Sequence, residues 1–458
     1  MKRIFTLLLM LAALSVAAQS YNNEWIKFNQ TYYKFKVANE GLLRISKTVL
    51  DAAGLGSADV QNLELWRNGV KVPFYSSVPT GALPSNGYLE FWGQPNDGKP
   101  DRDLYRDPVY QHTNKYNLIT DTAVYFLSVN NNQSGFRYQE VVNNVSGPLP
   151  PQELYFMYTA GNYYKTKINL GFAVDLKEYL YSSSYDKGEF WSSSDINPSA
   201  SSSIETTISG LAVYPSGPNA TFRFGVTGNA LNPRTVKATV DGVVVKDTVM
   251  DYFNDLNTSA TLPLTNITDG SATVKFSNGS PISTDRMVVS YFEIIYPREF
   301  KFGNQRKFRF TLPAKAAGYY FAIKEFDYGS TPPVLYDMAL GERYVGNTTA
   351  SPGSILFALP GTALPRDLVL VNAEVGNIAT VTSLTAKTFI DYNQALNQGN
   401  YLIITHPSLY VGSGGNNPVN DYKAYRESAA GGGYKVLVAE IDELVDQFAF
   451  GVKNIPFR

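Results

Sequence analysis

The stretch "VKATVDGVVVKDTV", residues 236–249, shows how most of this chain folds. On both sides of Asp241-Gly242, valines alternate with polar residues, which is the period of a strand with one buried face. An Asp-Gly pair supplies the two positive φ angles of a two-residue hairpin turn. The same pattern recurs in "LELWRNGVKVPFY" (63–75), with Asn68-Gly69 at the tip. Both segments predict antiparallel sheets joined by hairpins.

The composition agrees with a β-rich globular protein. Aromatic residues make up 14% of the 458 residues, charged residues 17% and hydrophobic residues 44%. The longest predicted strand runs from Met287 to Tyr296, and we expect Pro297 to end it because proline cannot donate to the ladder. One short helix is predicted, capped by Ser46 and stopped by Gly54. With a formal net charge of −1 and no basic run, the sequence predicts no nucleic-acid partner.

The N-terminus reads as an export signal. Lys2 and Arg3 precede an apolar run from Ile4 to Ala18, and small residues at its end suit cleavage before Gln19. No later segment is long and apolar enough to predict a membrane span. The Pro-rich stretch 147–151 predicts a break between two β domains. The predicted organisation is a signal peptide (1–18), an N-terminal β-rich domain (19–149), a jelly-roll-like β-sandwich (150–299), a β-rich connecting region (300–396) and an α/β segment (397–458).

The texture changes at "YLIITHPSLY", residues 401–410. Tyr401–Thr405 is a short strand that is apolar on both faces, as parallel strands are. Asn417 can cap a helix with Pro418 at its first position, and the glycines 431–433 are expected to end that helix. A second strand, "YKVLVAE" (434–440), and another helix, "DELVDQF" (442–448), follow. The order predicts a parallel, right-handed βαβ unit.

This last segment resembles the opening of the catalytic domain of gingipain-type cysteine peptidases. The words that carry the resemblance are "YLIITHP" and "DYKAYRESAAGGGYKVLVAEIDELVDQFAFGVKN" (421–454). Upstream, "LEFWGQPNDGKPDRDLYRDPVY" (89–110), "DTAVYFL" (121–127) and "YFEIIYPREF" (291–300) resemble the β-rich N-terminal part of long, PorU-like members associated with type IX secretion. The resemblance implies tandem β-sandwich or jelly-roll-like domains, followed by the first βαβ unit of a caspase-like α/β domain.

The resemblance assigns no catalytic residue to this chain. In the family, a catalytic His and Cys lie on loops beyond the second strand, whereas this sequence has no cysteine and reaches Arg458 before either position. We therefore expect a truncated sequence that is inactive alone, from an exported, secreted or surface-associated endopeptidase of a Gram-negative bacterium. A peptide substrate would bind the missing part, and type IX secretion components are the other expected partners. The alternative is a non-enzymatic surface protein whose sandwich domains bind glycan or protein.

One acidic loop is a candidate calcium site. "NDGKPDRDLYRD" (96–107) holds four carboxylates, and spaced carboxylates in a turn can bind calcium. The spacing departs from the EF-hand pattern, so the favoured interpretation is a solvated turn in which Arg102 and Arg106 pair locally. We expect no cofactor and no required metal. The carboxylates are Asp97, Asp101, Asp103 and Asp107.

The remaining candidates each have a structural interpretation that the sequence favours. His406 is expected to shape its loop by local hydrogen bonding, and His112 is expected on the surface without a partner, since no spacing supports a Ser-His-Asp set. Gly412 opens a glycine-rich word that lacks the third glycine of a dinucleotide fingerprint, so a surface loop is expected. Trp191, Tyr252 and Phe253 could form an aromatic platform for carbohydrate, although core packing is the favoured interpretation. Two short sequences resemble O-glycosylation motifs: Asp121-Thr122-Ala123 and Asp247-Thr248-Val249.

Overall fold

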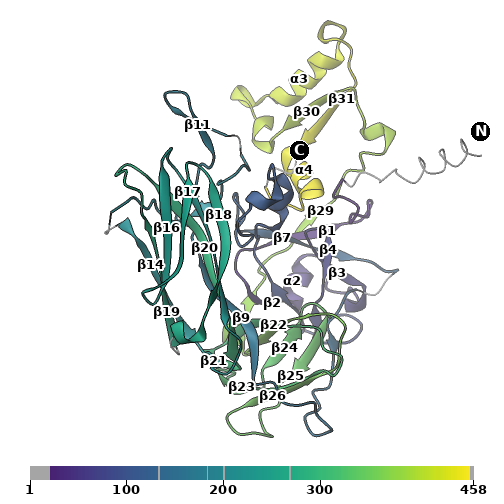
Figure 1. The fold of residues 1–458 in the computed structure, drawn as a ribbon. Coiled ribbons are helices and arrows are strands. Elements are labelled where there is room, and N and C mark those ends of the chain that lie inside the picture. The colour runs from purple at the N-terminus through teal and green to yellow at the C-terminus, as the bar shows by residue number, and fades with distance from the viewer. Residues whose placement is uncertain (1–20, 133–134, 183, 200–201, 268–269, 454–458) are drawn as a thin grey trace, which may run out of the picture.

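The computed structural model describes residues 21–132, 135–182, 184–199, 202–267 and 270–453. The predicted signal peptide, residues 1–18, lies outside these residues. As predicted, the protein is mainly β, and the α/β segment comes last, after the β sandwiches (Figure 1). Short 3-10 helices lie between the larger elements: η1 (Val60–Asn62), η2 (Lys99–Leu104), η3 (Pro108–Tyr110), η5 (Leu264–Asn266), η6 (Val375–Asn377), η7 (Ala395–Asn397), η8 (Pro407–Tyr410), η9 (Ser413–Gly415) and η10 (Ala429–Gly431).

The N-terminal part is a sandwich of two sheets around one apolar core, to which Phe35, Phe91 and Tyr125 contribute. The predicted hairpin is confirmed, with positive φ angles of 49° at Asn68 and 72° at Gly69. One sheet has the order β29 (Thr385–Lys387), β1 (Tyr32–Val37), β7 (Ala123–Val129), β3 (Leu63–Arg67) and β4 (Val70–Val72). The other has the order β28 (Ala379–Thr380), β2 (Gly41–Ser46), β6 (Tyr88–Gly93) and β5 (Tyr75–Ser76).

A short helix, α2 (Lys47–Ala52), follows β2, as the sequence predicts. The Ser46 hydroxyl accepts a hydrogen bond from the backbone N–H of Val49, which satisfies one of the free donors of the first turn. Gly54 has a φ of 77°, a left-handed conformation that commonly ends helices. Glycine adopts this conformation without the steric cost that a Cβ atom would bring.

The second sandwich buries a row of phenylalanines, among them Phe222, Phe224 and Phe276. Its hairpin at Asp241-Gly242 is confirmed by φ angles of 46° and 80°. One sheet has the order β14 (Ile204–Leu211), β19 (Gly270–Asn278), β16 (Pro233–Val240) and β17 (Val243–Asp251). The other has the order β18 (Asp255–Leu262), β15 (Ala220–Gly228), β20 (Met287–Glu299) and β9 (Tyr155–Tyr163). Two ribbons flank them: β10 (Lys167–Ile168) with β13 (Trp191–Ser192), and β11 (Ala173–Asp175) with β12 (Tyr179–Tyr181).

The prediction that Pro297 ends the longest strand is wrong. Strand β20 continues to Glu299, and Pro297 lies opposite Met157 of β9. The ladder between β20 and β15 ends at Ile295, so the missing N–H of the proline falls beyond the last pair on that side. Its carbonyl still accepts a hydrogen bond of 2.9 Å from the N–H of Tyr214.

A third pair of sheets packs around aromatic side chains, with Phe302 stacked on Phe308 at 3.9 Å between ring centroids. One sheet has the order β22 (Lys307–Leu312), β27 (Arg366–Val371), β24 (Val334–Asp337), β25 (Glu342–Val345) and β8 (Gln139–Glu140), and the other β21 (Lys301–Gln305), β23 (Tyr319–Phe326) and β26 (Ile355–Leu359). Strand β8 thus joins a sheet built largely from residues 307–371, and β28 and β29 return to the N-terminal sandwich. The domain boundaries predicted from sequence stay predictions.

The α/β segment contains the predicted unit. Strands β30 (Tyr401–Thr405) and β31 (Val436–Glu440) pair in parallel, with Tyr401 opposite Val436. Between them lies α3 (Pro418–Glu427), whose first turn is capped by Asn417, and α4 (Ile441–Phe448) follows β31 directly. Helix α3 ends at Glu427, before the glycines that were expected to end it, because Ser428 adopts an extended conformation there.

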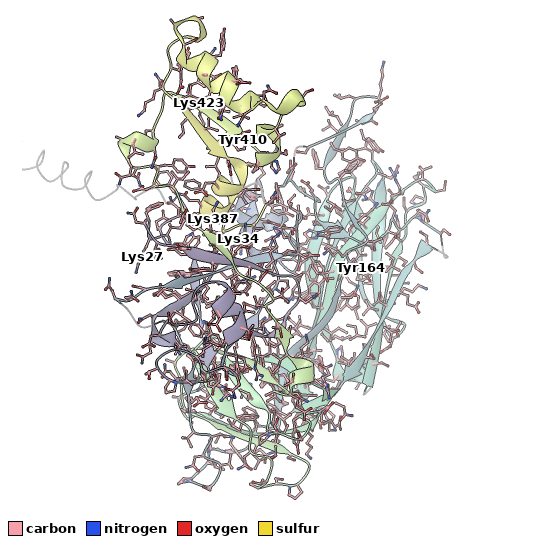
Figure 2. All side chains as sticks on the ribbon, turned by 180° about the vertical axis from the view of Figure 1, so that it is seen from behind. Lys27, Lys34, Tyr164, Lys387, Tyr410 and Lys423 are labelled. Carbon is pink, nitrogen blue, oxygen red and sulfur yellow. The ribbon has the colours of Figure 1, made fainter. Side chains whose placement is uncertain are left out.

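Helix α4 and the residues after it attach the α/β segment to the N-terminal sandwich. In Figure 1, α4 lies between β1 and β29 on one side and the projecting β30, β31 and α3 on the other. Lys34 of β1 forms an ion pair with the buried carboxylate of Asp446, and Lys387 of β29 pairs with Glu443. Figure 2 shows Lys34 and Lys387 together at this junction. We call these contacts, with Phe450, the α4 anchor.

The apolar part of the α4 anchor is an aromatic cluster centred on Trp25. The Trp25 side chain is 8% exposed, and its ring lies 5.0 Å from Phe126, 5.6 Å from Phe389 and 6.5 Å from Phe450. Phe450 reaches this cluster from beyond α4, so the end of the α/β segment shares a core with the first residues of the N-terminal sandwich.

Candidate functional site

The four carboxylates of the predicted calcium loop do not converge. Asp101 is fully buried, and its oxygens accept hydrogen bonds from the Asn117 side chain and from the N–H of Leu118 at 3.1 Å. Asp107 caps η3 through the N–H of Val109, whereas Asp103 is exposed. The prediction of a solvated turn is therefore wrong for Asp101, which fastens its loop to residues 117–118.

The local pairing predicted for the two arginines of this loop is also wrong for Arg106. Its guanidinium pairs with Asp186, 3.0 Å away, so the loop is tied to the segment that precedes β13. Burial raises the pKa of Asp101 to about 7, outweighing the hydrogen bond from Leu118 that lowers it, and the charge of Asp97 raises it further. A calcium ligand must be ionised, so this environment opposes metal binding. Among the described residues, no group of three or more His, Cys, Asp or Glu side chains could hold a metal ion.

We expect calcium to have no effect on the melting temperature, because the best-placed carboxylate already accepts two protein hydrogen bonds. The check is thermal unfolding with and without millimolar calcium, for the wild type, Asp101→Ala and the exposed-site control Asp103→Ala. A melting temperature that rises strongly with calcium in the wild type and the control, but not in Asp101→Ala, would contradict this prediction.

His112 is buried, so the prediction of a partnerless surface residue is wrong. Its side chain is fully enclosed, with Nδ1 2.9 Å from the Ser290 hydroxyl and Nε2 2.9 Å from Asp255 Oδ2. Phe190 covers the imidazole, with 4.4 Å between the ring centroids. His112 lies on the loop after η3, while Ser290 and Asp255 belong to β20 and β18, so the network joins this loop to the second sandwich.

A β-bulge and a glycine make room for His112. Gly225 pairs with Tyr291 whereas Val226 pairs with Val289, so Ser290 is the extra residue of the bulge. Bulges re-aim side chains, and here the hydroxyl of Ser290 faces the imidazole. A Cβ added at Gly225 would lie only 2.6 Å from Nδ1 of His112. Only glycine therefore allows this close approach.

The network has the residue types of a Ser-His-Asp triad but not its arrangement. In such a triad Nε2 of the histidine faces the serine and Nδ1 faces the carboxylate, whereas here the two nitrogens are exchanged. Ser290 is fully buried and also donates a hydrogen bond of 3.1 Å to the Gly225 carbonyl, so no substrate can reach it. We interpret the network as a latch for the loop.

The carboxylate of Asp255 contacts two side chains, those of His112 and Lys187. Burial acts to raise its pKa, but the hydrogen bonds and charges of His112 and Lys187 outweigh burial and place the pKa below the ordinary value. Lys187 lies 3.2 Å from Oδ1, on the opposite carboxylate oxygen from His112. Each oxygen therefore has one partner, and the carboxylate joins the loop residue His112 to Lys187.

Gly225→Ala is expected to break the latch and to lower the free energy of unfolding by about 1–3 kcal/mol, as overpacked sites do. Hydrogen exchange in residues 108–116 should rise at the same time. The matched control is Gly376→Ala in η6, where an added Cβ meets no described atom within 4 Å. Unchanged stability together with unchanged exchange in 108–116 would show that the contact is unimportant.

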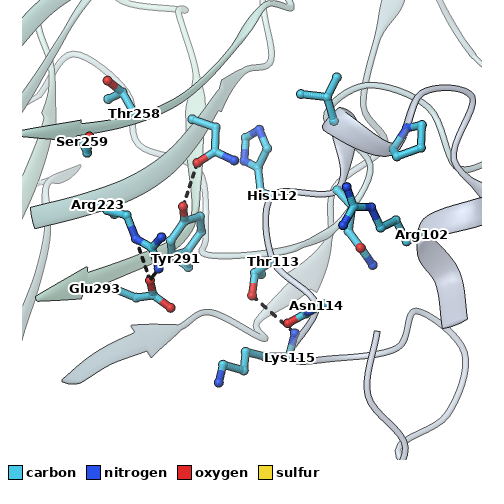
Figure 3. Close-up of a pocket in the computed structure, with 14 residues that line it drawn as sticks. Arg102, His112, Thr113, Asn114, Lys115, Arg223, Thr258, Ser259, Tyr291 and Glu293 are labelled. Atoms are coloured by element: carbon cyan, nitrogen blue, oxygen red, sulfur yellow. Dashed lines mark hydrogen bonds and ion pairs between the residues drawn. The ribbon is translucent and has the colours of Figure 1, made fainter. Parts of the chain in front are cut away.

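A pocket of about 540 Å³ opens beside the latch, between the loop and the outer face of the sheet that contains β15 and β20. We call it the loop pocket (Figure 3). On the sheet side, Arg223 Nε donates a 3.1 Å hydrogen bond to Glu293, whose other oxygen accepts from the Tyr163 hydroxyl. The Tyr291 hydroxyl donates to Asn257 Oδ1 at 2.7 Å. The loop after η3 contributes His112, Thr113, Asn114 and Lys115, and η2 contributes Arg102.

The other sequence candidates do not form sites. His406 behaves as predicted: its Nδ1 accepts a 3.2 Å hydrogen bond from Ser408 N–H and lies 2.8 Å from the Ser408 hydroxyl at the start of η8. Gly414 and Gly415 both have positive φ angles in an exposed turn. Asn417, at the place of the third glycine of the fingerprint, caps α3 instead.

The three aromatic residues of the predicted carbohydrate platform differ in environment. Phe253 is 1% exposed and packs edge-on against Tyr179, whereas Tyr252 is 51% exposed. Trp191 is half-buried, and its indole N–H donates to the Asn117 carbonyl at 2.9 Å. The core interpretation holds for Phe253. The two O-glycosylation words stay predictions; Asp121 pairs with Lys165, and residues 247–249 belong to β17.

Sequence reasoning missed Ser290, Asp255, Arg223 and Glu293. The available signal was two polar residues inside the otherwise apolar strand "RMVVSYFEIIYPR" (286–298), at Ser290 and Glu293.

In the part of the chain that the structure describes, no helix is long and apolar enough to cross a membrane.

Comparison by sequence finds neither a family model nor a curated protein that matches this chain. Comparison of structures finds dimeric latent PorU from Porphyromonas gingivalis, with a TM-score of 0.56 and 13% identity over 96% of this chain. The chain has the fold of a part of PorU. It covers 39% of the PorU chain. This likeness agrees with the predicted tandem β domains.

Smaller likenesses concern carbohydrate-binding modules. A family 36 module, solved with calcium and xylotriose, matches with 12% identity and a TM-score of 0.20, covering 30% of this chain and 98% of the module. A family 35 module from Clostridium thermocellum matches with 16% identity and a TM-score of 0.14, covering 22% of this chain and 98% of the module. Both scores are too low to support a functional argument.

Proposed function

We propose that this chain is the β-rich N-terminal platform of an exported, PorU-like cysteine endopeptidase of the gingipain type. The observation that carries the proposal is the likeness to latent PorU over 96% of this chain. In this role the β domains support the α/β segment and restrain it. Export to the cell surface, peptide substrates and type IX secretion components as partners are part of the proposal.

The open sheet of the α/β segment supports this function. Strands β30 and β31 form a two-stranded sheet, and Leu402 and Ile404 are 56% and 55% exposed on one of its faces. Parallel sheets are normally covered on both faces. An α/β catalytic domain that continues this sheet with further strands and helices would cover these side chains.

The α4 anchor supports the idea of restraint. In open α/β sheets, ligands bind at the carboxyl ends of the strands. Strand β31 ends at Glu440, and α4 begins at the next residue and packs against the N-terminal sandwich through Asp446 and Glu443. The carboxyl edge of the sheet therefore faces the N-terminal sandwich (Figure 1). A domain held in this way has its reactive edge next to the platform.

The chemistry of such a peptidase is thiolate attack on a peptide carbonyl, assisted by an imidazole base and a backbone oxyanion hole. None of the 458 residues is a cysteine. His112 is enclosed in the latch, and His406 bonds to its own loop. The thiolate and its base would thus come from residues outside this sequence, and this chain would contribute position and restraint.

The test has two steps. The coding sequence that follows codon 458 is read first, and we expect an open frame that encodes further strands, a histidine and later a cysteine. The full product is then assayed on Arg- and Lys-containing peptides under reducing conditions, with the cysteine replaced by alanine as control. A stop codon at position 459 in the genome, or cleavage that survives loss of the cysteine, would overturn the proposal.

The second candidate is a non-enzymatic surface protein whose sandwich domains bind glycan or protein. Its sequence basis, the aromatic platform, is weakened because Phe253 is buried. The observation that favours it is the loop pocket, which lies on the outer face of the second sandwich.

A further inference from the structure

The two cavities beside the loop after η3 differ in charge balance. The larger, about 830 Å³, has four cations in its lining. Arg309, Arg366 and Lys99 each form an ion pair with an acidic side chain, and the fourth, Lys115, also lines the loop pocket. The loop pocket has three cations in its lining, Arg102, Lys115 and Arg223, but only one carboxylate, that of Glu293.

The single carboxylate of the loop pocket is already used. Glu293 accepts from both Nε and Nη2 of Arg223 through one oxygen and from the Tyr163 hydroxyl through the other. Among the described residues, neither Arg102 nor Lys115 forms an ion pair. Lys115 instead lies over the Tyr163 ring, 5.2 Å from its centroid. The pocket therefore carries two positive charges that its own walls do not neutralise.

The rest of the lining is rich in hydroxyl and amide groups. The side-chain carbonyl oxygen of Asn257 accepts a hydrogen bond from Tyr291. The amide hydrogens of Asn257 are therefore the groups that it can offer to a ligand. Thr113, Asn114, Thr258 and Ser259 add further polar groups, whereas Pro108 and Val109 are the apolar members of the lining. The ring of Tyr291 stacks on that of Tyr163 at an interplanar angle of 11°, which provides a flat aromatic surface.

We propose that the loop pocket binds a short acidic saccharide. The carboxylate of a uronic acid would pair with Arg102 and Lys115, its hydroxyls would bond to the amides and hydroxyls, and its ring would pack near Tyr291. The volume falls within the range of small-molecule sites, which is roughly 300–1,000 Å³. This inference concerns a site distinct from the α/β segment, and it holds whether or not the chain supports a peptidase.

The polar lining favours a saccharide over an acidic peptide. A peptide segment in a pocket buries apolar side chains, and this pocket offers few apolar partners for them. Sugar hydroxyls, in contrast, pair with the amide and hydroxyl groups that dominate its walls. Burial and the charge of Glu293 raise the pKa of Tyr291 to about 12, so its hydroxyl stays protonated at neutral pH and keeps its hydrogen bond to Asn257 Oδ1.

The test is calorimetric titration of the full chain with digalacturonate and diglucuronate, and with their neutral methyl esters as matched ligands. At least one free acid is expected to bind, with its ester about tenfold weaker or worse, because the ester loses the charge-assisted hydrogen bonds. The double variant Arg102→Gln/Lys115→Gln should bind the acid about tenfold more weakly. Lys237→Gln, which removes an exposed lysine on the opposite sheet, should bind like the wild type.

Three results would overturn the proposal. One is the absence of binding by either acid up to roughly 10 mM, the weak end of specific binding. Another is equal affinity for acid and ester, or for the wild type and the double variant. The third is a tetraglutamate peptide that binds as tightly as the acids and loses affinity in the double variant, which would assign the site to acidic peptides. Thermal unfolding of the variants verifies that they are folded.

Discussion

Arg234→Met is expected to lower the free energy of unfolding of the second sandwich by about 3–5 kcal/mol, because it leaves a buried charge without its partner. Arg234 and Asp285 are both fully buried and share two hydrogen bonds of 2.8 Å. The guanidinium also donates to the carbonyls of Ala230 and Tyr252 and so joins the loops at one end of the sandwich. Urea unfolding, followed by hydrogen exchange in β20, measures the loss.

Two further variants separate the buried charge from other effects. The double variant Arg234→Met/Asp285→Leu should recover much of the stability, since both charges are gone. Lys275→Met removes an exposed pair in which Nζ lies 3.8 Å from Glu205, and it should change stability by less than about 0.5 kcal/mol. If Arg234→Met had as small an effect as Lys275→Met, the buried pair would not stabilise the sandwich.

Trp25→Ala is expected to cost about 3–5 kcal/mol, the usual loss for deleting a buried tryptophan side chain. Because Trp25 contacts both the N-terminal sandwich and Phe450, exchange in α4 should accelerate about a hundredfold for a loss of about 3 kcal/mol. Exchange in residues 287–299 of the second sandwich should stay unchanged. Mass spectrometry of exchanged peptides gives both values in one experiment.

Phe450→Ala removes the aromatic ring that the α/β segment contributes to the Trp25 cluster and leaves the N-terminal sandwich intact. It should accelerate exchange in α4 while the N-terminal strands β1 and β7 stay protected. Tyr21→Ala removes an aromatic ring that is 60% exposed and serves as the neutral control. Equal exchange in α4 for the wild type, Trp25→Ala and Phe450→Ala would mean that the aromatic cluster does not hold the α/β segment.

The features that sequence predicted well are local ones. Asn68-Gly69 and Asp241-Gly242 specify their turns through backbone conformations that few other pairs adopt cheaply. The parallel pairing of 401–405 with 436–440 followed from two apolar runs with a capped helix between them. Pro297 was misjudged because a proline is tolerated wherever the neighbouring ladder has ended, and the end of that ladder depends on tertiary pairing.

The latch and the loop pocket depend on contacts between distant residues. His112 is 178 positions from Ser290 and 143 from Asp255. The bulge that turns Ser290 toward the imidazole is visible only once Gly225 is paired with Tyr291. A lone histidine in a polar segment gives no sign of burial. His112 is buried by strands β18 and β20, which lie far from it in the sequence.

The α4 anchor was also hidden from sequence analysis. Glu443 and Asp446 are acidic residues of the short helix α4, yet both are buried and pair with Lys387 and Lys34. The two lysines come from β1 and β29, which are adjacent in the sheet although far apart in the chain. Such charge pairing appears only in the folded structure.

We expect that the N-terminal sandwich holds the α/β segment in place and that this segment does not fold alone. The segment has a two-stranded sheet with exposed Leu402 and Ile404, so its apolar burial is too small to offset an ordering cost of about 1–2 kcal/mol per residue. The most direct test is an amide NMR spectrum of the isolated peptide 397–458, recorded beside the whole chain. We expect the fragment to show the narrow dispersion of an unfolded peptide. A well-dispersed spectrum with slowly exchanging amides in 401–405 and 436–440 would contradict it.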